Sequence, residues 1–385
     1  MRQQSSCCQL PEPVSEVTDL SGFDLVISSG GAAAVLGGTG AAVAAQLAGL
    51  NSWRRLGGVS GGSLVAAMVA AGLDSNELLR LATESRMESY LTASQGLIGL
   101  PARLVGWKFK HRVHSRPHQE NCRWNGLFGS DNLGFLVEKV MEDRPASQAE
   151  LFCPAAGGTR WPLNLWTMAT TRDGSQVVFD ANGVHHVCLR GVKRKISDEV
   201  AAPGTALRAS CTIPGVMASV DYRGIRLYDG AMSRDGICPV GLEIRSFGAD
   251  PRKIIAVRVG EDLHKPILGR LHTAARIACG VHPDFHWGPE TVGVIECRPQ
   301  IDHVHTLKFI VSDDEKWLAI LIGFEAMLSQ LALHGILKGD RLLRARSILQ
   351  CIGFWRDAIP QAIGRYQPLA RRIKDCFTEH GLLTG

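Results

Sequence analysis

The serine at position 60 stands in a pattern typical of a catalytic nucleophile. Gly58-Val59-Ser60-Gly61-Gly62 contains the spacing Gly-x-Ser-x-Gly, in which a serine lies at a sharp turn between a strand and a helix. Glycines such as Gly58 and Gly62 suit this turn because a Cβ at either position would clash in so tight a bend. A serine held in this way can attack a carbonyl carbon, so the pattern predicts acyl transfer.

The segments on either side of Ser60 have the composition that this turn needs. Leu56 to Val59 can end a buried strand, and Ser63 to Ala71 is an alanine-rich, apolar run with good helix propensity. The helix N-terminus would then lie behind Ser60, with unpaired N–H groups of which that of Gly61 is nearest. Such groups can stabilise the negative oxygen that develops when the serine attacks.

A second glycine-rich loop follows the first predicted strand. The apolar run Phe23 to Ser28 leads into Ser29-Gly30-Gly31, where a glycine pair exposes backbone amides, and Gly37 to Gly40 would then open a helix over Ala41 to Leu50. This order of elements is a βαβα unit, which predicts a parallel sheet covered by helices on both faces. Both loops should emerge at the same sheet edge, one with the nucleophile and the other with amides.

The same glycines also allow a rival hypothesis of phosphate binding. Gly38-x-Gly40 lacks the third glycine of a dinucleotide-binding turn, and the chain contains no Gly-Lys-Ser/Thr. The sequence therefore favours the acyl-transfer interpretation of this region.

The remainder of the chain is expected to continue the sheet. Hairpins are predicted from 163–170 with 176–180 and from 217–222 with 225–228, and the second ends at Asp229-Gly230-Ala231. An aspartate at such a position, taken alone, is most often a turn former. Further strands are expected over 254–259 and 304–311. The apolar run from 317 to 337 is interrupted by polar residues, which favours a buried or interfacial helix over a membrane span.

Composition is ordinary for a globular protein, with 385 residues, 45% hydrophobic and 21% charged. The 11 cysteines are scattered without a CxxC pair, which predicts reduced thiols, no zinc site and a cytoplasmic location. No secretory signal is visible over 1–20. A net charge of +5, spread along the chain, does not indicate nucleic-acid binding but is compatible with binding to an anionic lipid surface.

A basic insert that also contains aromatic residues covers 96–124. It is either a segment that contacts a membrane or forms a lid, or a solvated loop.

Several segments together resemble the patatin-like phospholipase family over about 23–260, with 335 as an alternative end. The matching stretches, in order, are Leu25 to Gly31, Gly58 to Leu64, Ala206 to Val216, Gly224, Tyr228 to Ala231 and Cys238 to Val240. Each stretch is weak alone, but their shared order is specific.

The resemblance implies a fold and a mechanism. The fold would be a three-layer α/β domain with a mostly parallel central sheet and helices on both faces. The family's Ser-Asp dyad would fall on Ser60 as nucleophile and Asp229 as general base, with Gly230 and Ala231 completing the motif. Oxyanion donors would be the backbone amides of Gly30 and Gly31. An acyl lipid would be the substrate, cleaved by phospholipase A or lysophospholipase activity without metal or organic cofactor.

The predicted organisation has three parts: a flexible segment at 1–21, the catalytic core from 22 to 260 or 335, and a helical extension at 336–385. Two alternatives to this mechanism stay open. Ala32 and Ala34 replace a usual glycine and a usual basic residue after the Gly30 loop, so an inactive lipid-binding or scaffold protein is one alternative. The other is an α/β-hydrolase triad in which His286, His303 or His305 supplies the base.

Overall fold

The computed structural model describes residues 22–93, 128–187, 192–214, 216–233, 235–259, 287–304, 308–356 and 369–384. The predicted flexible segment at 1–21 and all of the basic insert at 96–124 lie outside the described residues. The strands of the main sheet are β1 (Asp24–Ile27), β2 (Arg55–Gly58), β7 (Leu165–Thr171), β8 (Gln176–Asp180), β9 (Gly183–Val187), β10 (Lys193–Ser197), β11 (Val220–Tyr222), β12 (Ile225–Asp229), β13 (Ile254–Val257) and β14 (Ile295–Cys297). Two small antiparallel pairs lie outside it: β3 (Thr92–Ala93) with β4 (Phe128–Gly129), and β5 (Phe152–Pro154) with β6 (Arg160–Pro162).

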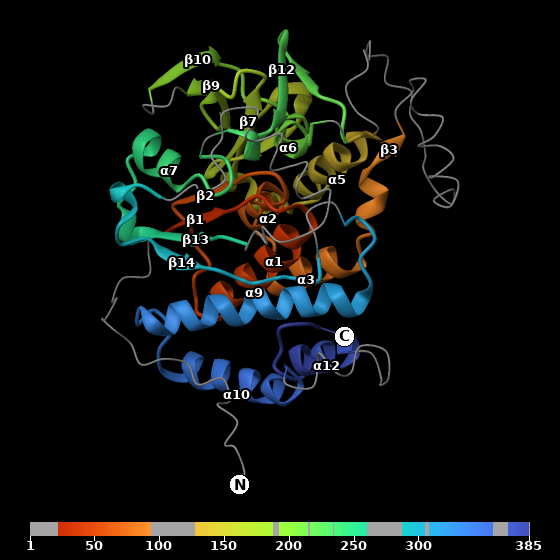
Figure 1. Ribbon diagram of the computed structural model, residues 1–385, viewed down its shortest axis with the longest axis vertical. Helices are drawn as coiled ribbons and strands as arrows, with labels where there is room; N and C mark the ends of the chain where they lie inside the picture. The colour runs from red at the N-terminus through yellow and green to blue at the C-terminus, as the bar shows by residue number, and fades with distance from the viewer. Residues whose placement is uncertain are drawn as a thin grey trace.

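The α-helices of the described residues surround this sheet (Figure 1). They are α1 (Gly31–Leu47), α2 (Gly61–Ala70), α3 (Ser75–Glu84), α5 (Asp131–Glu142), α6 (Pro203–Cys211), α7 (Val240–Phe247), α9 (Asp313–Leu333), α10 (Gly339–Arg356) and α12 (Leu369–Glu379). Short 3₁₀ turns include η1 (Met87–Tyr90) and η5 (Gly230–Met232).

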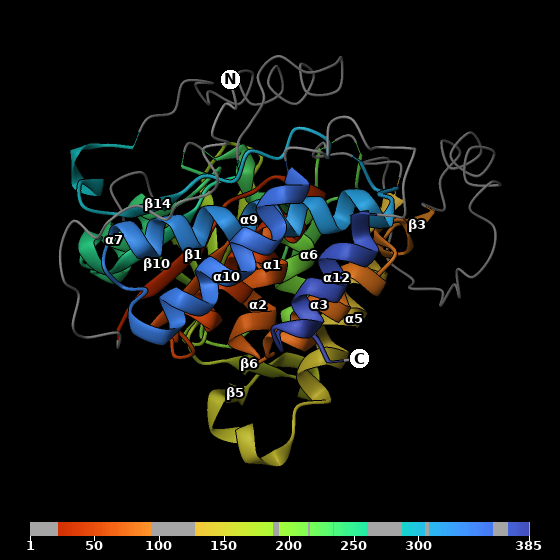
Figure 2. The same cartoon turned by 90° about the horizontal axis from the view of Figure 1, so that it is seen from below.

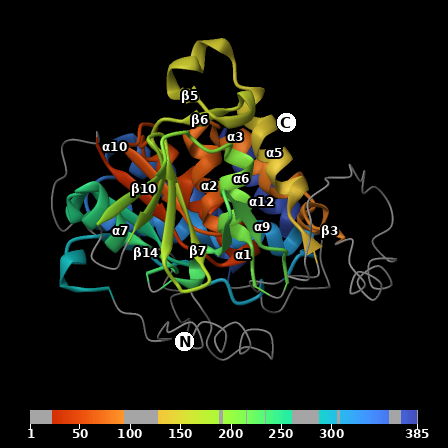
Figure 3. The same cartoon turned by 90° about the horizontal axis from the view of Figure 1, so that it is seen from above.

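The centre of the sheet is parallel, in the order β7-β2-β1-β13-β14. On the other side of β7 the sheet continues with antiparallel β8, β9 and β10, and β12 also pairs with β7 and carries β11 (Figure 3). Short turns such as the one between β7 and β8 connect only antiparallel neighbours, whereas α1 provides the crossover between parallel β1 and β2. The predicted α/β fold with a mostly parallel central sheet is confirmed.

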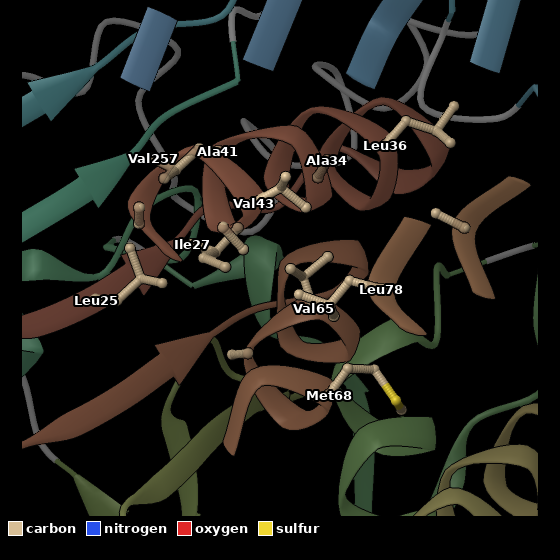
Figure 4. Packing of buried hydrophobic residues seen from close by; sticks show 14 of the residues in the cluster. Leu25, Ile27, Ala34, Leu36, Ala41, Val43, Val65, Met68, Leu78 and Val257 are labelled. Carbon is tan, nitrogen blue, oxygen red and sulfur yellow. The ribbon is translucent and has the colours of Figure 1, made fainter. Parts of the chain in front are cut away.

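The core lies on both faces of the sheet, as expected for buried parallel strands. Leu25 and Ile27 of β1 lie in one buried cluster with residues of α1, α2 and α9, and Figure 4 shows Ile27 beside Val43 of α1. Val26 points the other way, into a smaller cluster that includes residues of α7. Helices therefore cover both faces, with most of them on the α1 side.

The glycine-rich stretch at 37–40 corrects one prediction. These residues lie within α1, which begins at Gly31 and ends at Leu47, whereas the expected helix covered Ala41 to Leu50. A Cβ added to Gly40 would overlap the Ile320 carbonyl of α9, and one added to Gly323 of α9 would overlap the Gly37 carbonyl. The glycines therefore allow two helix backbones to touch. The phosphate-loop hypothesis for 37–40 is wrong because this backbone is helical.

Helix α9 is long and apolar enough to span a membrane by length and composition, with 61% of its most apolar window buried inside the protein. It lies between α1 and the pair α10 and α12 (Figure 1), and Figure 2, seen from below, shows α10 and α12 in front of it. Phe377 of α12 packs on Phe324 and Trp317 of α9, with ring centroids 5.1 and 6.0 Å apart. The prediction of a buried or interfacial helix is confirmed for 313–333, and α10 and α12 lie in the segment after 336. The domain boundaries themselves stay a prediction.

The strand prediction over 304–311 is wrong for its described residues, which adopt no strand. The last strand of the sheet is instead β14 at Ile295–Cys297, beside β13. Its three residues include a charged one, Glu296, so the stretch lacks the apolar run that marks a buried strand. Both predicted hairpins are confirmed as β7 with β8 and β11 with β12.

Candidate active site

Ser60 occupies the turn between β2 and α2 and has a backbone conformation that is unusual for a residue other than glycine. Its φ is 53° and its ψ is −131°. Such a conformation costs on the order of 1–3 kcal/mol and persists only where its surroundings enforce it. A Cβ on Gly58 would lie 2.5 Å from the Gly62 carbonyl oxygen, and one on Gly62 would lie 2.6 Å from the Ile27 carbonyl oxygen. The glycines are thus needed for the reason predicted from the sequence.

Asp229 ends β12 and contacts Ser60 directly. The Ser60 hydroxyl donates a 2.7 Å hydrogen bond to Oδ2 of Asp229, and Oδ1 accepts a 2.8 Å bond from the N–H of Ala231. The N–H of Asp229 donates to the Thr212 carbonyl at 2.7 Å. Both side chains are nearly enclosed, since Ser60 is 4% and Asp229 is 2% exposed. The structure therefore brings together the two residues to which the sequence assigned nucleophile and base.

Strand β7 positions both of them. Its first half pairs in parallel with β2, which places Gly58 beside Thr167, and its second half pairs with β12, which places Asp229 beside Ala169. The Thr167 hydroxyl also donates to the Gly58 carbonyl at 3.1 Å. Because Thr167 and Ala169 are two residues apart, they lie on the same face of the strand. One strand thus aligns the serine turn with the aspartate.

Two further serines hold the backbone of the turn. The Ser210 hydroxyl accepts the Ser60 N–H at 3.0 Å and donates to the Met168 carbonyl at 2.7 Å. The Ser63 hydroxyl donates to the Ser60 carbonyl at 2.6 Å. Sequence reasoning did not assign these roles. The available signal was the Ala206 to Val216 stretch, which the family resemblance had singled out.

The predicted oxyanion donors lie at the N-termini of α1 and α2. Gly30 and Gly31 have φ values of 146° and 56°, which side chains rarely adopt. In the described part of the chain, the N–H groups of Gly30, Gly31 and Gly61 have no protein acceptor. A Cβ on Gly61 would overlap the Gly31 carbonyl, so the two loops touch. Amides without a protein acceptor therefore lie in the two loops that meet beside Ser60.

The amides of neighbouring residues are engaged elsewhere. Ser29 donates to the Ile237 carbonyl at 2.7 Å, and Gly62 donates to the Val59 carbonyl at 3.0 Å. The departures from the family at Ala32 and Ala34 fall inside α1, where both side chains are buried. Ala34 lies in the core, and the backbone amides of the loop do not depend on its side chain.

Cys211 lies behind the serine turn without acting on it. Its Sγ is 3.8 Å from the Ser63 hydroxyl. Burial, with a further contribution from the Asp229 charge, raises the pKa of the Cys211 thiol far above its usual range. The thiol is therefore neutral and a poor nucleophile at ordinary pH.

The histidines of the triad alternative can be placed only in part. His303 lies beside the start of α9, with Nε2 3.0 Å from the Glu315 carbonyl oxygen, and burial lowers its pKa. His286 and His305 lie outside the described residues. Within the described ranges, no group of three His, Cys, Asp or Glu residues is placed to hold a metal ion.

The sheet, the serine turn and the adjoining aspartate define an α/β protein with a Ser-Asp pair at the edge where the parallel strands end. Residues 25–240, more than half of the chain, match the family model for the patatin-like phospholipases. The chain belongs to this family, and lipid acyl hydrolysis is the activity that the family suggests.

Among solved structures, VipD from Legionella pneumophila matches 96% of this chain and 84% of that chain, with a TM-score of 0.42 and 13% identity. No protein with a curated description matches.

Proposed function

We propose that this protein hydrolyses carboxylic esters of phospholipids or other acyl lipids through an acyl-Ser60 intermediate, with Asp229 as general base. The observation that carries the proposal is the 2.7 Å hydrogen bond between the Ser60 hydroxyl and the Asp229 carboxylate. Nucleophile and base must lie within such reach for the proton to transfer as the bond to carbon forms. Membership of the patatin-like family supports an acyl lipid as the substrate.

The first half-reaction forms the acyl-enzyme. The Ser60 oxygen attacks the ester carbonyl carbon while its proton passes to Oδ2 of Asp229. The carbonyl oxygen becomes negative, and the unpaired amides of Gly30, Gly31 and Gly61 are the available donors to it. Collapse of this intermediate breaks the bond to the alcohol oxygen, which takes the proton from Asp229 and leaves.

The second half-reaction releases the acid. A water molecule gives its proton to Asp229 as its oxygen attacks the acyl carbon, and the resulting oxyanion uses the same amides. When the bond to Ser60 breaks, the proton returns to the serine oxygen and the fatty acid departs. Asp229 alone moves the proton in each step, so the mechanism needs neither a histidine nor a metal.

Hydrolysis by matched variants tests this mechanism. Purified wild type, Ser60→Ala, Asp229→Asn and His303→Ala would be assayed on p-nitrophenyl butyrate and on a panel of phospholipids and lysophospholipids. We expect losses on the order of 10³-fold or more in the first two variants, since nucleophile and base act as a unit, and activity near wild type in His303→Ala. The panel also distinguishes phospholipase A from lysophospholipase activity.

Other results would favour the alternatives. Retained turnover in Asp229→Asn, with loss in a variant of His286, His303 or His305, would replace the dyad with a triad. A folded wild type that neither hydrolyses esters nor reacts at Ser60 with a fluorophosphonate would instead indicate an inactive lipid-binding protein.

A further inference from the structure

A narrow apolar pocket lies among α1, α2, α3, η1 and α5. About 490 Å³ in and around it is not occupied by protein atoms, a volume that includes open solvent. Of its fourteen lining residues, eleven are aliphatic or methionine, and none is charged. Figure 4 shows three of them, Val65 and Met68 of α2 and Leu78 of α3, close to one another. The proposed catalytic steps use none of these side chains.

Two of the lining residues lie one helical turn from the proposed active site. Leu64 lies one helical turn after Ser60, and Val35 lies one turn after Gly31, so the first lining residues of α2 and α1 follow directly on the nucleophile and an oxyanion donor. These helix N-termini touch where Gly61 meets the Gly31 carbonyl. Met68 follows Ser60 by eight residues, which corresponds to about 12 Å along α2.

The lining selects an apolar occupant. The Thr39 hydroxyl is already bonded to the Val35 carbonyl within α1, at 2.8 Å. A polar ligand would replace few of its hydrogen bonds to water here, because only three of the fourteen lining residues, Thr39, Ser85 and Tyr90, are polar. Each buried methylene, in contrast, strengthens binding by about fourfold. Leu64 and Leu81 are only half-buried, so the cavity opens at its rim.

We propose that this pocket holds the acyl chain of the substrate, and that Leu78 and Ala82 of α3 set the preferred chain length. The inference rests on the proposed function, because it requires the ester carbonyl to lie at Ser60 while the chain extends along α2. Leu78 lies on α3, which follows α2 in the chain and lies away from the Ser60 turn. Its side chain is buried and lines the pocket. A larger side chain at Ala82 would shorten the space, and a smaller one at Leu78 would extend it.

A chain-length series tests the inference. Initial rates on p-nitrophenyl esters from acetate to palmitate would be compared for wild type, Ala82→Phe and Leu78→Ala, with Arg80→Leu as a control at an exposed position of the same helix. We expect Ala82→Phe to lower the rate on long esters at least about tenfold relative to the rate on acetate, as several methylenes lose their burial. Leu78→Ala should shift the optimum to longer chains. Unchanged ratios of long-chain to short-chain rates in both variants would overturn the inference.

Binding of laurate to Ser60→Ala, measured by calorimetry, separates the pocket from the chemistry. A second substitution, Ala82→Phe, in the Ser60→Ala protein should weaken laurate binding at least about tenfold. If the double variant does not fold, Leu81→Trp is used in place of Ala82→Phe. Unaltered binding would refute the pocket even if esters are hydrolysed. If no Ser60-dependent hydrolysis is found but Ala82→Phe still weakens laurate binding, the proposed function is wrong and the assignment of the pocket stands.

Discussion

Ser210 and Ser60 are linked through the backbone of the nucleophile, because the Ser210 hydroxyl accepts a hydrogen bond from the Ser60 N–H at 3.0 Å and donates one to the Met168 carbonyl at 2.7 Å. Ser210 is fully buried. This bridge joins α6, the serine turn and β7. It supplies part of the restraint that keeps Ser60 at a positive φ.

Ser210→Ala should therefore impair both stability and turnover. The substitution leaves the buried Ser60 N–H without an acceptor, which costs about 1–3 kcal/mol. Because the turn loses a restraint, we expect kcat to fall about tenfold or more with a smaller change in KM. Urea unfolding and ester kinetics check this, with the exposed Ser89→Ala as control. A kcat equal to wild type would show that Ser210 does not position the nucleophile.

The conformation of Ser60 predicts an order of stability among its variants. Ser60→Gly and Ser60→Ala both remove the hydroxyl bond to Asp229, but only alanine keeps a Cβ at φ 53°. Relief of this strain should make Ser60→Gly more stable than Ser60→Ala by about 1–3 kcal/mol. Thermal unfolding of the two proteins measures the difference. Equal stabilities would mean that the turn is not strained.

The contact between α1 and α9 predicts a contrast between two glycines of one helix. A Cβ on Gly40 would overlap the Ile320 backbone, whereas one on Gly38 would lie 3.2 Å from Ile27 and 3.3 Å from Val65 side chains. We expect Gly40→Ala to destabilise by about 3 kcal/mol or more, because backbone cannot move aside as side chains can. Gly38→Ala should stay within about 1 kcal/mol of wild type, since alanine favours the helix. Denaturant midpoints would decide, and similar losses in both would refute the contact.

The buried carboxyl of Glu243 should make stability depend on pH. The carboxylate accepts hydrogen bonds from the side chains of Arg55 and Trp166, near the start of β2 and so at the sheet edge opposite Ser60. The charged groups of Asp24, Arg54 and Lys193 also interact with Glu243. Burial, followed by the Asp24 charge, raises the pKa of Glu243 from 4.5 to about 7. Between these values the folded protein binds more protons than the unfolded chain. Glu243 therefore lowers stability progressively as pH rises from about 4.5 to 7.

Glu243→Gln tests this effect because glutamine does not ionise. We expect the melting temperature of Glu243→Gln minus that of wild type to grow by a few degrees between pH 5 and pH 8. Each kcal/mol of stability shifts the melting temperature by about 2–4 °C. The comparison cancels groups that titrate equally in both proteins. A difference in melting temperature that stays constant over this range would show that the pKa of Glu243 is not raised.

Local features of the site were predictable, and long-range ones were not. The glycines around Ser60 exclude a Cβ for a steric reason that the sequence pattern contains, and the turn was placed correctly. Asp229, taken alone, indicated only a turn, and its role required the family resemblance. Ser210 and the continuation of α1 through Gly37 to Gly40 depend on partners in β7 and α9. No local pattern identifies such partners.

The sequence by itself determined the strand-turn-helix at Ser60, the glycine loop at Gly30 and the hairpin that ends at Asp229, because these follow from backbone sterics and short-range periodicity. Only the tertiary structure decided that Ser60 and Asp229, 169 positions apart, share a hydrogen bond. That contact requires β7 to pair with β2 through one half and with β12 through the other. Strand register arises from packing of the whole sheet, so the dyad exists only once that sheet has formed.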